Sequence, residues 1–90
     1  MKRGRKQDHM IVAIHVTDRV RQAGKVQAVL TQYGGNIKTR IGLHEPMPGG
    51  TSPNGIILLE MVGEANIAPD VIAALSKVRG VEAKSIVFAH

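Results

Sequence analysis

The stretch that decides the fold is residues 10–37, MIVAIHV-TDRVRQAGKVQAVLTQY-GGNI. Its first seven residues are apolar apart from His15 and rich in β-branched side chains, and a capping residue, Thr17 or Asp18, follows at once. They therefore predict a short buried strand. An amphipathic helix is predicted over about 18–33, because apolar side chains recur there at helical spacing: Ala23, Val26, Leu30 and Tyr33. The two glycines at 34–35 are expected to end this helix in the left-handed conformation.

The following residues predict four more elements. Residues 36–45 alternate between apolar and polar side chains, as a half-exposed strand does. One face of this strand is expected to carry Ile37, Thr39, Ile41 and Leu43. Beyond it, the pattern predicts a long loop rich in Pro and Gly, a buried strand, a second amphipathic helix and a last strand, over residues 46–55, 56–62, 67–79 and 81–88.

The resulting order is strand–helix–strand–strand–helix–strand. Because crossover connections are right-handed, this order predicts an α+β domain with the ferredoxin-like βαββαβ split. In that fold a four-stranded antiparallel sheet carries both helices on one face. The two most apolar strands, 10–16 and 56–62, are expected at the centre of the sheet. Ninety residues leave room for a single domain.

Positive charge is concentrated at the start of the chain. The net charge is +5, and residues 1–10 hold four cations against Asp8, which amounts to +3. We expect residues 1–9 to be a basic disordered tail and residues 10–90 to be the folded domain. No run of about 18 apolar residues occurs, so no membrane association is expected.

Several classes of function are disfavoured by composition. The chain has no cysteine, which excludes disulfides, thiolate metal sites and a cysteine nucleophile. The four histidines lack metal-ligand spacing, and no catalytic constellation is visible, so we expect neither a metal, nor a cofactor, nor enzyme activity. The aromatic residues are Tyr33 and Phe88 alone, too few to stack bases on the sheet, so nucleic acid is disfavoured as a partner for this domain by itself.

The face of the predicted sheet opposite the helices is unusually apolar. It is expected to carry Ile11, Ala13, Ile56, Leu58, Ile86 and Phe88, with Lys38, Arg40, His15, His44, Glu60 and Lys84 among them. A contiguous apolar patch of this kind is typical of an interface. We therefore expect a homo-oligomer, a dimer or tetramer formed through this face or through strand edges.

Parts of the sequence resemble a known family. Asp18 followed by VQAVLTQYGGNI at 26–37 resembles the first half of an ACT domain, a ferredoxin-like module that senses small molecules. The sequence is also similar to the ACT-like family of iron-only hydrogenase system regulators in two places. On the next strand a single residue separates Arg40 from Gly42, as in that family, and residues 72–84 match its pattern. The resemblance covers residues 10–88.

The resemblance implies a stand-alone regulatory domain, dimeric or tetrameric, in a bacterial cytoplasm. The chain is also similar to the sensor half of nickel-responsive repressors. Two departures matter. Arg19 and Val20 stand where amino-acid-binding ACT loops usually have Pro-Gly, and the nickel sensors use a cysteine ligand that this chain lacks.

The leading hypothesis is a regulatory domain that binds a small molecule or anion and signals through a homo-oligomer, with transcriptional regulation as one setting. Its ligand site is expected at Arg40, Gly42 and His44, because a guanidinium beside a glycine allows a carboxylate or phosphate to approach closely. An intersubunit salt bridge is the alternative role for Arg40. The alternative functions are a protein-interaction module without a small-molecule ligand and a metal-sensing domain.

Overall fold

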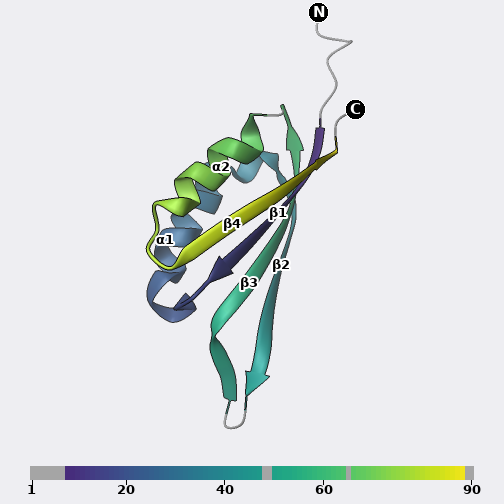
Figure 1. Ribbon diagram of the computed structural model, residues 1–90. Helices are drawn as coiled ribbons and strands as arrows, with labels where there is room; N and C mark the ends of the chain where they lie inside the picture. The colour runs from purple at the N-terminus through teal and green to yellow at the C-terminus, as the bar shows by residue number, and fades with distance from the viewer. Residues whose placement is uncertain (1–7, 48–49, 65, 89–90) are drawn as a thin grey trace, which may run out of the picture.

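A computed structural model describes residues 8–47, 50–64 and 66–88, without the side chains of residues 19–20 and 44–53. Strand β1 (Asp8–Val16) leads into α1 (Arg19–Gln32) and a short 3-10 turn, η1 (Gly34–Asn36). Strands β2 (Ile37–Met47) and β3 (Gly50–Gly63) form a hairpin, and α2 (Ile67–Ser76) connects it to β4 (Val81–Phe88) (Figure 1). This is the order of elements that the sequence predicts.

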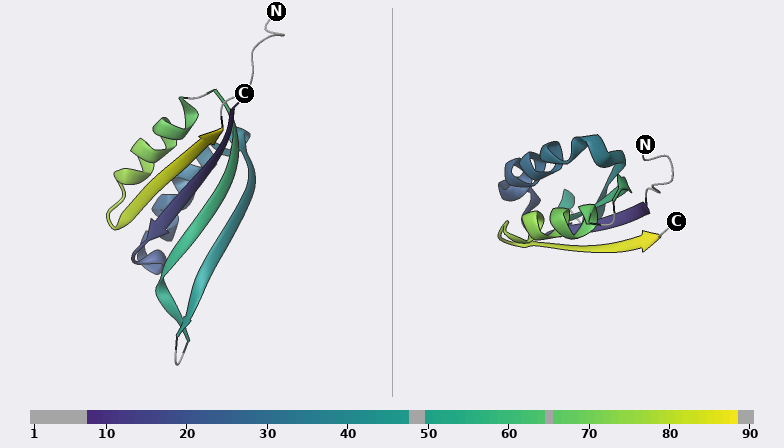
Figure 2. Two further views of the ribbon diagram at one scale, coloured as in Figure 1. Left: turned by 45° about the vertical axis from the view of Figure 1, so that its right-hand side comes forward. Right: turned by 90° about the horizontal axis from the view of Figure 1, so that it is seen from above.

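The four strands form one antiparallel sheet in the order β2-β3-β1-β4. Both helices lie on one side of it, so the molecule has two layers, and the other side of the sheet is open (Figure 2). The ferredoxin-like βαββαβ fold and the central positions of β1 and β3 are therefore confirmed. No helix of the described residues is long and apolar enough to cross a membrane.

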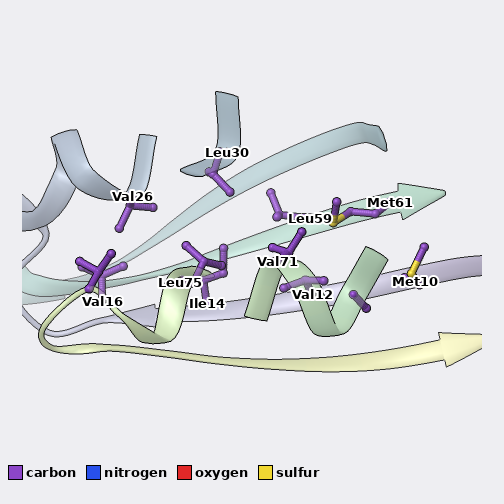
Figure 3. Close-up of a cluster of buried hydrophobic side chains, with 12 residues drawn as sticks. Met10, Val12, Ile14, Val16, Val26, Leu30, Leu59, Met61, Val71 and Leu75 are labelled. Carbon is purple, nitrogen blue, oxygen red and sulfur yellow. The ribbon is translucent and has the colours of Figure 1, made fainter. Parts of the chain in front are cut away.

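The core fills the space between the sheet and the helices (Figure 3). The central strands supply side chains that are at most 1% exposed, and the helices pack apolar side chains onto them; the labelled core residues include Val12, Ile14, Leu59, Met61, Val26, Leu30, Val71 and Leu75. These strand residues face the helices as the alternation predicts. Gln22 of α1 is buried as well, and its Oε1 has no hydrogen-bond partner among the described residues.

The helix ends differ in detail from expectation. Asp18 caps α1 by accepting a hydrogen bond from the Arg21 backbone N–H at 3.3 Å. The glycines at 34–35 do not take the left-handed conformation; they continue the chain as η1. Helix α2 ends at Ser76, three residues early, and the positive φ of 78° falls on Gly80, at the turn into β4. The glycine in the left-handed conformation therefore lies immediately before β4, four residues after the last residue of α2.

The predicted loop over residues 46–55 is wrong, because β2 and β3 continue through it as a ribbon. Pro46 pairs with Thr51 and Met47 with Gly50; residues 48–49 lie outside the described residues. β1 pairs with β3 only from Gly55 onward, so the ribbon has two strands. Proline is tolerated there because each strand has an outer edge whose N–H groups need no partner. The ribbon extends beyond the helices at one end of the sheet (Figure 1).

A register shift in β2 changes which residues share a face. Ile37 pairs with Met61, but Thr39 pairs with the adjacent Glu60, which leaves Lys38 as an extra residue. A bulge of this kind reverses the alternation that follows it. Ile37 therefore packs against the core, whereas Thr39, Ile41 and Leu43 share the open face with their partners on β3. Arg40 and Gly42 lie on the helix side, and the expectation that Arg40 belongs to the open face is wrong.

The start of the chain lies partly outside the structure. Residues 1–7, most of the expected basic tail, are outside the described residues. β1 begins at Asp8, two residues before the expected start, and Asp8 and His9 pair with Gly63 and Val62 of β3.

Two glycine-to-alanine substitutions should have opposite effects on stability. Gly24 lies inside α1, and a Cβ added to it would meet no atom within 4 Å, so Gly24→Ala should raise the free energy of unfolding by about 0.5–1 kcal/mol. Gly63 has a φ of 151°, and a Cβ there would lie 2.7 Å from Nδ2 of Asn36. Gly63→Ala should lower the free energy of unfolding by about 1–3 kcal/mol. Urea unfolding measures both, and equal effects of one sign would contradict the glycine geometry.

Candidate ligand pocket

A pocket of about 370 Å³ lies between α1 and the hairpin strands. The end of β1 and α1 contribute four of its lining residues, Val16, Ala23, Val26 and Gln27. β2 and β3 contribute the other six, Arg40, Gly42, Leu43, Gly55, Ile56 and Ile57. The pocket is therefore on the helix side of the sheet, next to the point where the two-stranded ribbon begins.

Small residues keep this space open. α1 packs against β3 and α2, and β2 lies to the side of it. Gly42 has no side chain, and a Cβ built on it would meet no atom within 4 Å. Ala23 of α1 contributes only a methyl group from its side of the pocket. A residue of ordinary size at either position would fill part of the pocket.

Arg40 is the single charged residue among the ten that line the pocket. Its Nη1 donates a hydrogen bond of 2.8 Å to Oε1 of Gln27, which lies on α1. Gln27 is neutral, so this contact orients the guanidinium without compensating its charge. No ion pair joins Arg40 to a carboxylate within the described part of the chain. The remaining N–H groups of the guanidinium form a planar fork that suits a carboxylate or phosphate.

The structure brings together two of the three site residues expected from the sequence. Arg40 and Gly42 both line the pocket, although on the opposite side of the sheet from the one expected for Arg40. His44 belongs to β2, where its backbone pairs with Gly55, a lining residue. The side chain of His44 lies outside those that the structure describes, so its expected role stays a prediction.

The lining residues that α1 and β3 contribute were not predicted from the sequence. Ala23 and Gln27 are four residues apart, which places them on one face of a helix. The sequence spacing alone therefore shows that Ala23 and Gln27 share a helix face. It does not show that Arg40 lies opposite them, because the side on which Arg40 lies depends on the bulge in β2. Among the described residues, no group of three or more His, Asp or Glu side chains gathers in a way that could hold a metal ion.

Comparisons with known proteins bear on the fold. No family model matches the chain, and no curated protein matches its sequence. The structure resembles that of an uncharacterised protein from Thermotoga maritima, with a TM-score of 0.77 and 21% identity over 93% of this chain and 100% of that one. It also resembles an unknown protein from Galdieria sulphuraria, with a TM-score of 0.67 and 21% identity over 92% of this chain. This chain spans 50% of that protein's length.

A third solved structure is a nitrogen regulatory PII-like protein from Thiomonas intermedia bound to ADP, AMP and bicarbonate. Its TM-score is 0.49 and its identity 12%, over 94% of this chain and 100% of that chain. A likeness at that level carries no argument about function. The first two structures place this chain among proteins of ferredoxin-like fold, and at 21% identity they show the fold alone.

Replacing Gly42 by valine should narrow the pocket without harming the fold. The space around Gly42 is open, and valine suits a strand better than glycine does, so Gly42→Val should leave the free energy of unfolding unchanged or raise it by up to about 1 kcal/mol. Urea unfolding followed by circular dichroism measures this. Gly42→Ala is the smaller matched control. A loss of more than about 1 kcal/mol for both variants would contradict an open pocket at this position.

Proposed function

We propose that this chain is a regulatory domain of the ACT-like type that binds a small organic anion in the pocket at Arg40 and passes the signal on through a homo-oligomer. The observation that carries the proposal is the guanidinium of Arg40, exposed and hydrogen-bonded to the exposed Gln27, at a pocket of suitable size. About 370 Å³ lies within the range of roughly 300–1,000 Å³ typical of small-molecule sites. The family resemblance of residues 10–88 favours a regulatory role, including in transcription.

The contact between Arg40 and Gln27 supports an anionic ligand. A guanidinium hydrogen-bonded to an amide oxygen is partly oriented in advance, which reduces the side-chain entropy that a ligand must remove on binding. A carboxylate or phosphate would supply the missing negative charge through charge-assisted hydrogen bonds, which are about twice as strong as neutral ones.

The other walls of the pocket favour a ligand with an apolar part. Val16, Val26 and Ile57 present aliphatic side chains to it, and Gly42 and Gly55 present backbone. An anionic group at Arg40 and an aliphatic portion against these walls would match both halves of the pocket. The chemical class that fits is therefore a small carboxylate or phosphate with a short apolar body.

The lining residues also support binding without turnover. None of the ten carries a hydroxyl, thiol, imidazole, carboxylate or amine that could act as a nucleophile or as a general base. An arginine stays protonated and can orient or stabilise an anion, but it does not exchange protons at neutral pH. We therefore propose a sensor domain and not an enzyme.

Ligand binding at Arg40 can be tested by thermal shift. Wild-type protein is screened against aliphatic carboxylates, amino acids, nucleotides and divalent cations, because a ligand that binds only the folded form raises Tm. We expect a carboxylate or phosphate compound to raise Tm. Arg40→Ala should weaken its binding by about tenfold or more, since a charge-assisted hydrogen bond contributes roughly 1.5–3 kcal/mol. Gly42→Val should also block it, by filling the pocket.

Arg79→Ala is the matched control, because it removes an exposed guanidinium from the turn between α2 and β4, outside both the pocket and the open face of the sheet. Its Kd should stay within about twofold of the wild-type value. If Arg40→Ala left every binding signal and the assembly state unchanged, the site would lie elsewhere. The basic segment at residues 1–7 would then be the better candidate for an anion site.

A second candidate function is a module that only docks another protein. The apolar open face of the sheet favours it, since several large side chains there are exposed. The two functions are separable by substitution: Arg40 and Gly42 line the pocket alone, and Ile86 and Phe88 belong to the open face alone, although Leu43 and Ile56 border both.

A further inference from the structure

The open face of the sheet exposes large apolar side chains. Ile86 and Phe88 of β4 are 59% and 57% exposed, and Ile41 of β2 is 50% exposed. Leu43 and Ile56 are also exposed, and Ile11 and Leu58 are half-buried between them. Neither helix covers these residues, because both helices lie on the other side of the sheet (Figure 2).

The strand register places these residues in a diagonal band. Leu43 lies beside Ile56, and Ile41 lies beside Leu58 on the β2–β3 side. Leu58 is followed across the sheet by Ala13 of β1, and Ile11 lies beside Ile86 on β4, with Phe88 beyond it. We call the set Leu43, Ile56, Ile41, Leu58, Ala13, Ile11, Ile86 and Phe88 the apolar band. It runs from β2 near the ribbon to the far end of β4.

Two polar corners flank the apolar band, one on each side. The first is Thr39 and Glu60, joined by a hydrogen bond of 2.9 Å from the threonine Oγ1 to the glutamate Oε1. The exposed Lys38 lies next to it at the bulge. The second corner holds His15, Glu82 and Lys84. There, Nζ of Lys84 lies 3.8 Å from Oε2 of Glu82, and both side chains are largely exposed.

The second corner is also hollow. A depression of about 240 Å³ lies over Ala13, with Ile56, His15, Glu82 and Lys84 around it. Ala13 is the smallest side chain of the band, and its register partner on β4 is Lys84. The hollow therefore presents an apolar floor, with the amine of Lys84 and the carboxylate of Glu82 at its side, and the amine suits an incoming carboxylate.

We propose that the open face docks onto the open face of a second copy of this chain, about a two-fold axis that runs along the apolar band. Such an axis lays each band on the other. It also brings the Thr39–Glu60 corner of one copy over the hollow corner of the other. Glu60 of each copy then lies beside Lys84 of the other copy, so this pair occurs twice. Lys38 of each copy lies toward Glu82 of the other.

The charge pattern favours a second copy as the occupant. The face carries its own complement, because each corner holds a carboxylate and an amine: Glu60 with Lys38 on one side of the band, and Glu82 with Lys84 beside the hollow on the other. A two-fold interface uses the same patch on both partners and requires this kind of self-complementarity. An unrelated partner would not need the two corners to match. This interface is the surface that joins the copies in the homo-oligomer of the proposed function, and it rests on that part of the proposed function. The ligand site at Arg40 is tested separately.

A charge swap tests the proposal directly. Analytical ultracentrifugation of the wild-type protein at tens of micromolar should give a mass of at least twice the 9.7 kDa of one chain. Glu60→Lys and Lys84→Glu should each weaken association by about tenfold or more, because each places like charges together across the interface. The double variant should associate nearly as tightly as the wild type. Ile86→Asp should abolish association, because it places a charge in the apolar band.

Lys25→Glu on α1 is the matched control, because it makes the same change of charge on the helix side of the molecule and should leave the mass unchanged. Circular dichroism confirms that each variant is folded. The chain has no cysteine, so mixing Glu60→Cys with Lys84→Cys provides a second measurement. The mixture should form disulfide-linked dimers faster than either variant alone.

Three results would overturn the proposal. They are a folded wild-type protein with the mass of one chain, an Ile86→Asp variant that associates as tightly as the wild type, and a double charge variant no better than the single ones. Thermal shift with the aliphatic carboxylates and nucleotides of the pocket screen is run on the same preparations. A monomer that still binds the ligand would refute the interface while leaving the proposed ligand site intact.

Discussion

The bulge at Lys38 is the constraint on which both candidate surfaces depend. Without it, the period-2 alternation of β2 would carry on from Ile37, and Ile41 and Leu43 would face the helices. The extra residue reverses this, so that Ile37 stays in the core while Arg40 and Gly42 turn toward α1. One irregularity in the hydrogen-bonded ladder thus creates the pocket on one side of the sheet and completes the apolar band on the other.

The fold could be predicted from the sequence because it depends on patterns that are strong and local. The apolar run over β1 and the helical stripe of α1 are each interpretable alone, and their order leaves few topologies. The faces of β1 and β3 could be predicted for the same reason, since Val12, Ile14, Leu59 and Met61 alternate without interruption and are all buried. The faces of β2 after Ile37 could not, because no residue type marks a bulge at Lys38.

The candidate site was predictable in its chemistry but not in its position. Arg40 and Gly42 stand out by residue type alone, as a cation beside a position without a side chain. Their partner Gln27 lies thirteen residues before Arg40, on α1, and only the packing of the helix beside β2 brings its amide within 2.8 Å of the guanidinium. The ribbon was missed for a different reason. Proline and glycine in residues 46–55 are typical of a loop, but a two-stranded ribbon accepts them because its outer edges are unpaired.

The two surfaces share one strand, and this gives the proposed signal a physical route. Arg40 and Gly42 face the pocket, while Ile41 belongs to the open face, so residues that serve the two roles alternate along β2, and Leu43 of the open face also borders the pocket. A ligand that shifts β2 toward α1 moves both sets of side chains together, since adjacent residues of a strand cannot move independently. The coupling must then be reciprocal: if the ligand strengthens association, association strengthens ligand binding by the same factor. In this sheet, ligand binding on one face and association with a second copy on the other face can therefore be coupled through the single strand β2.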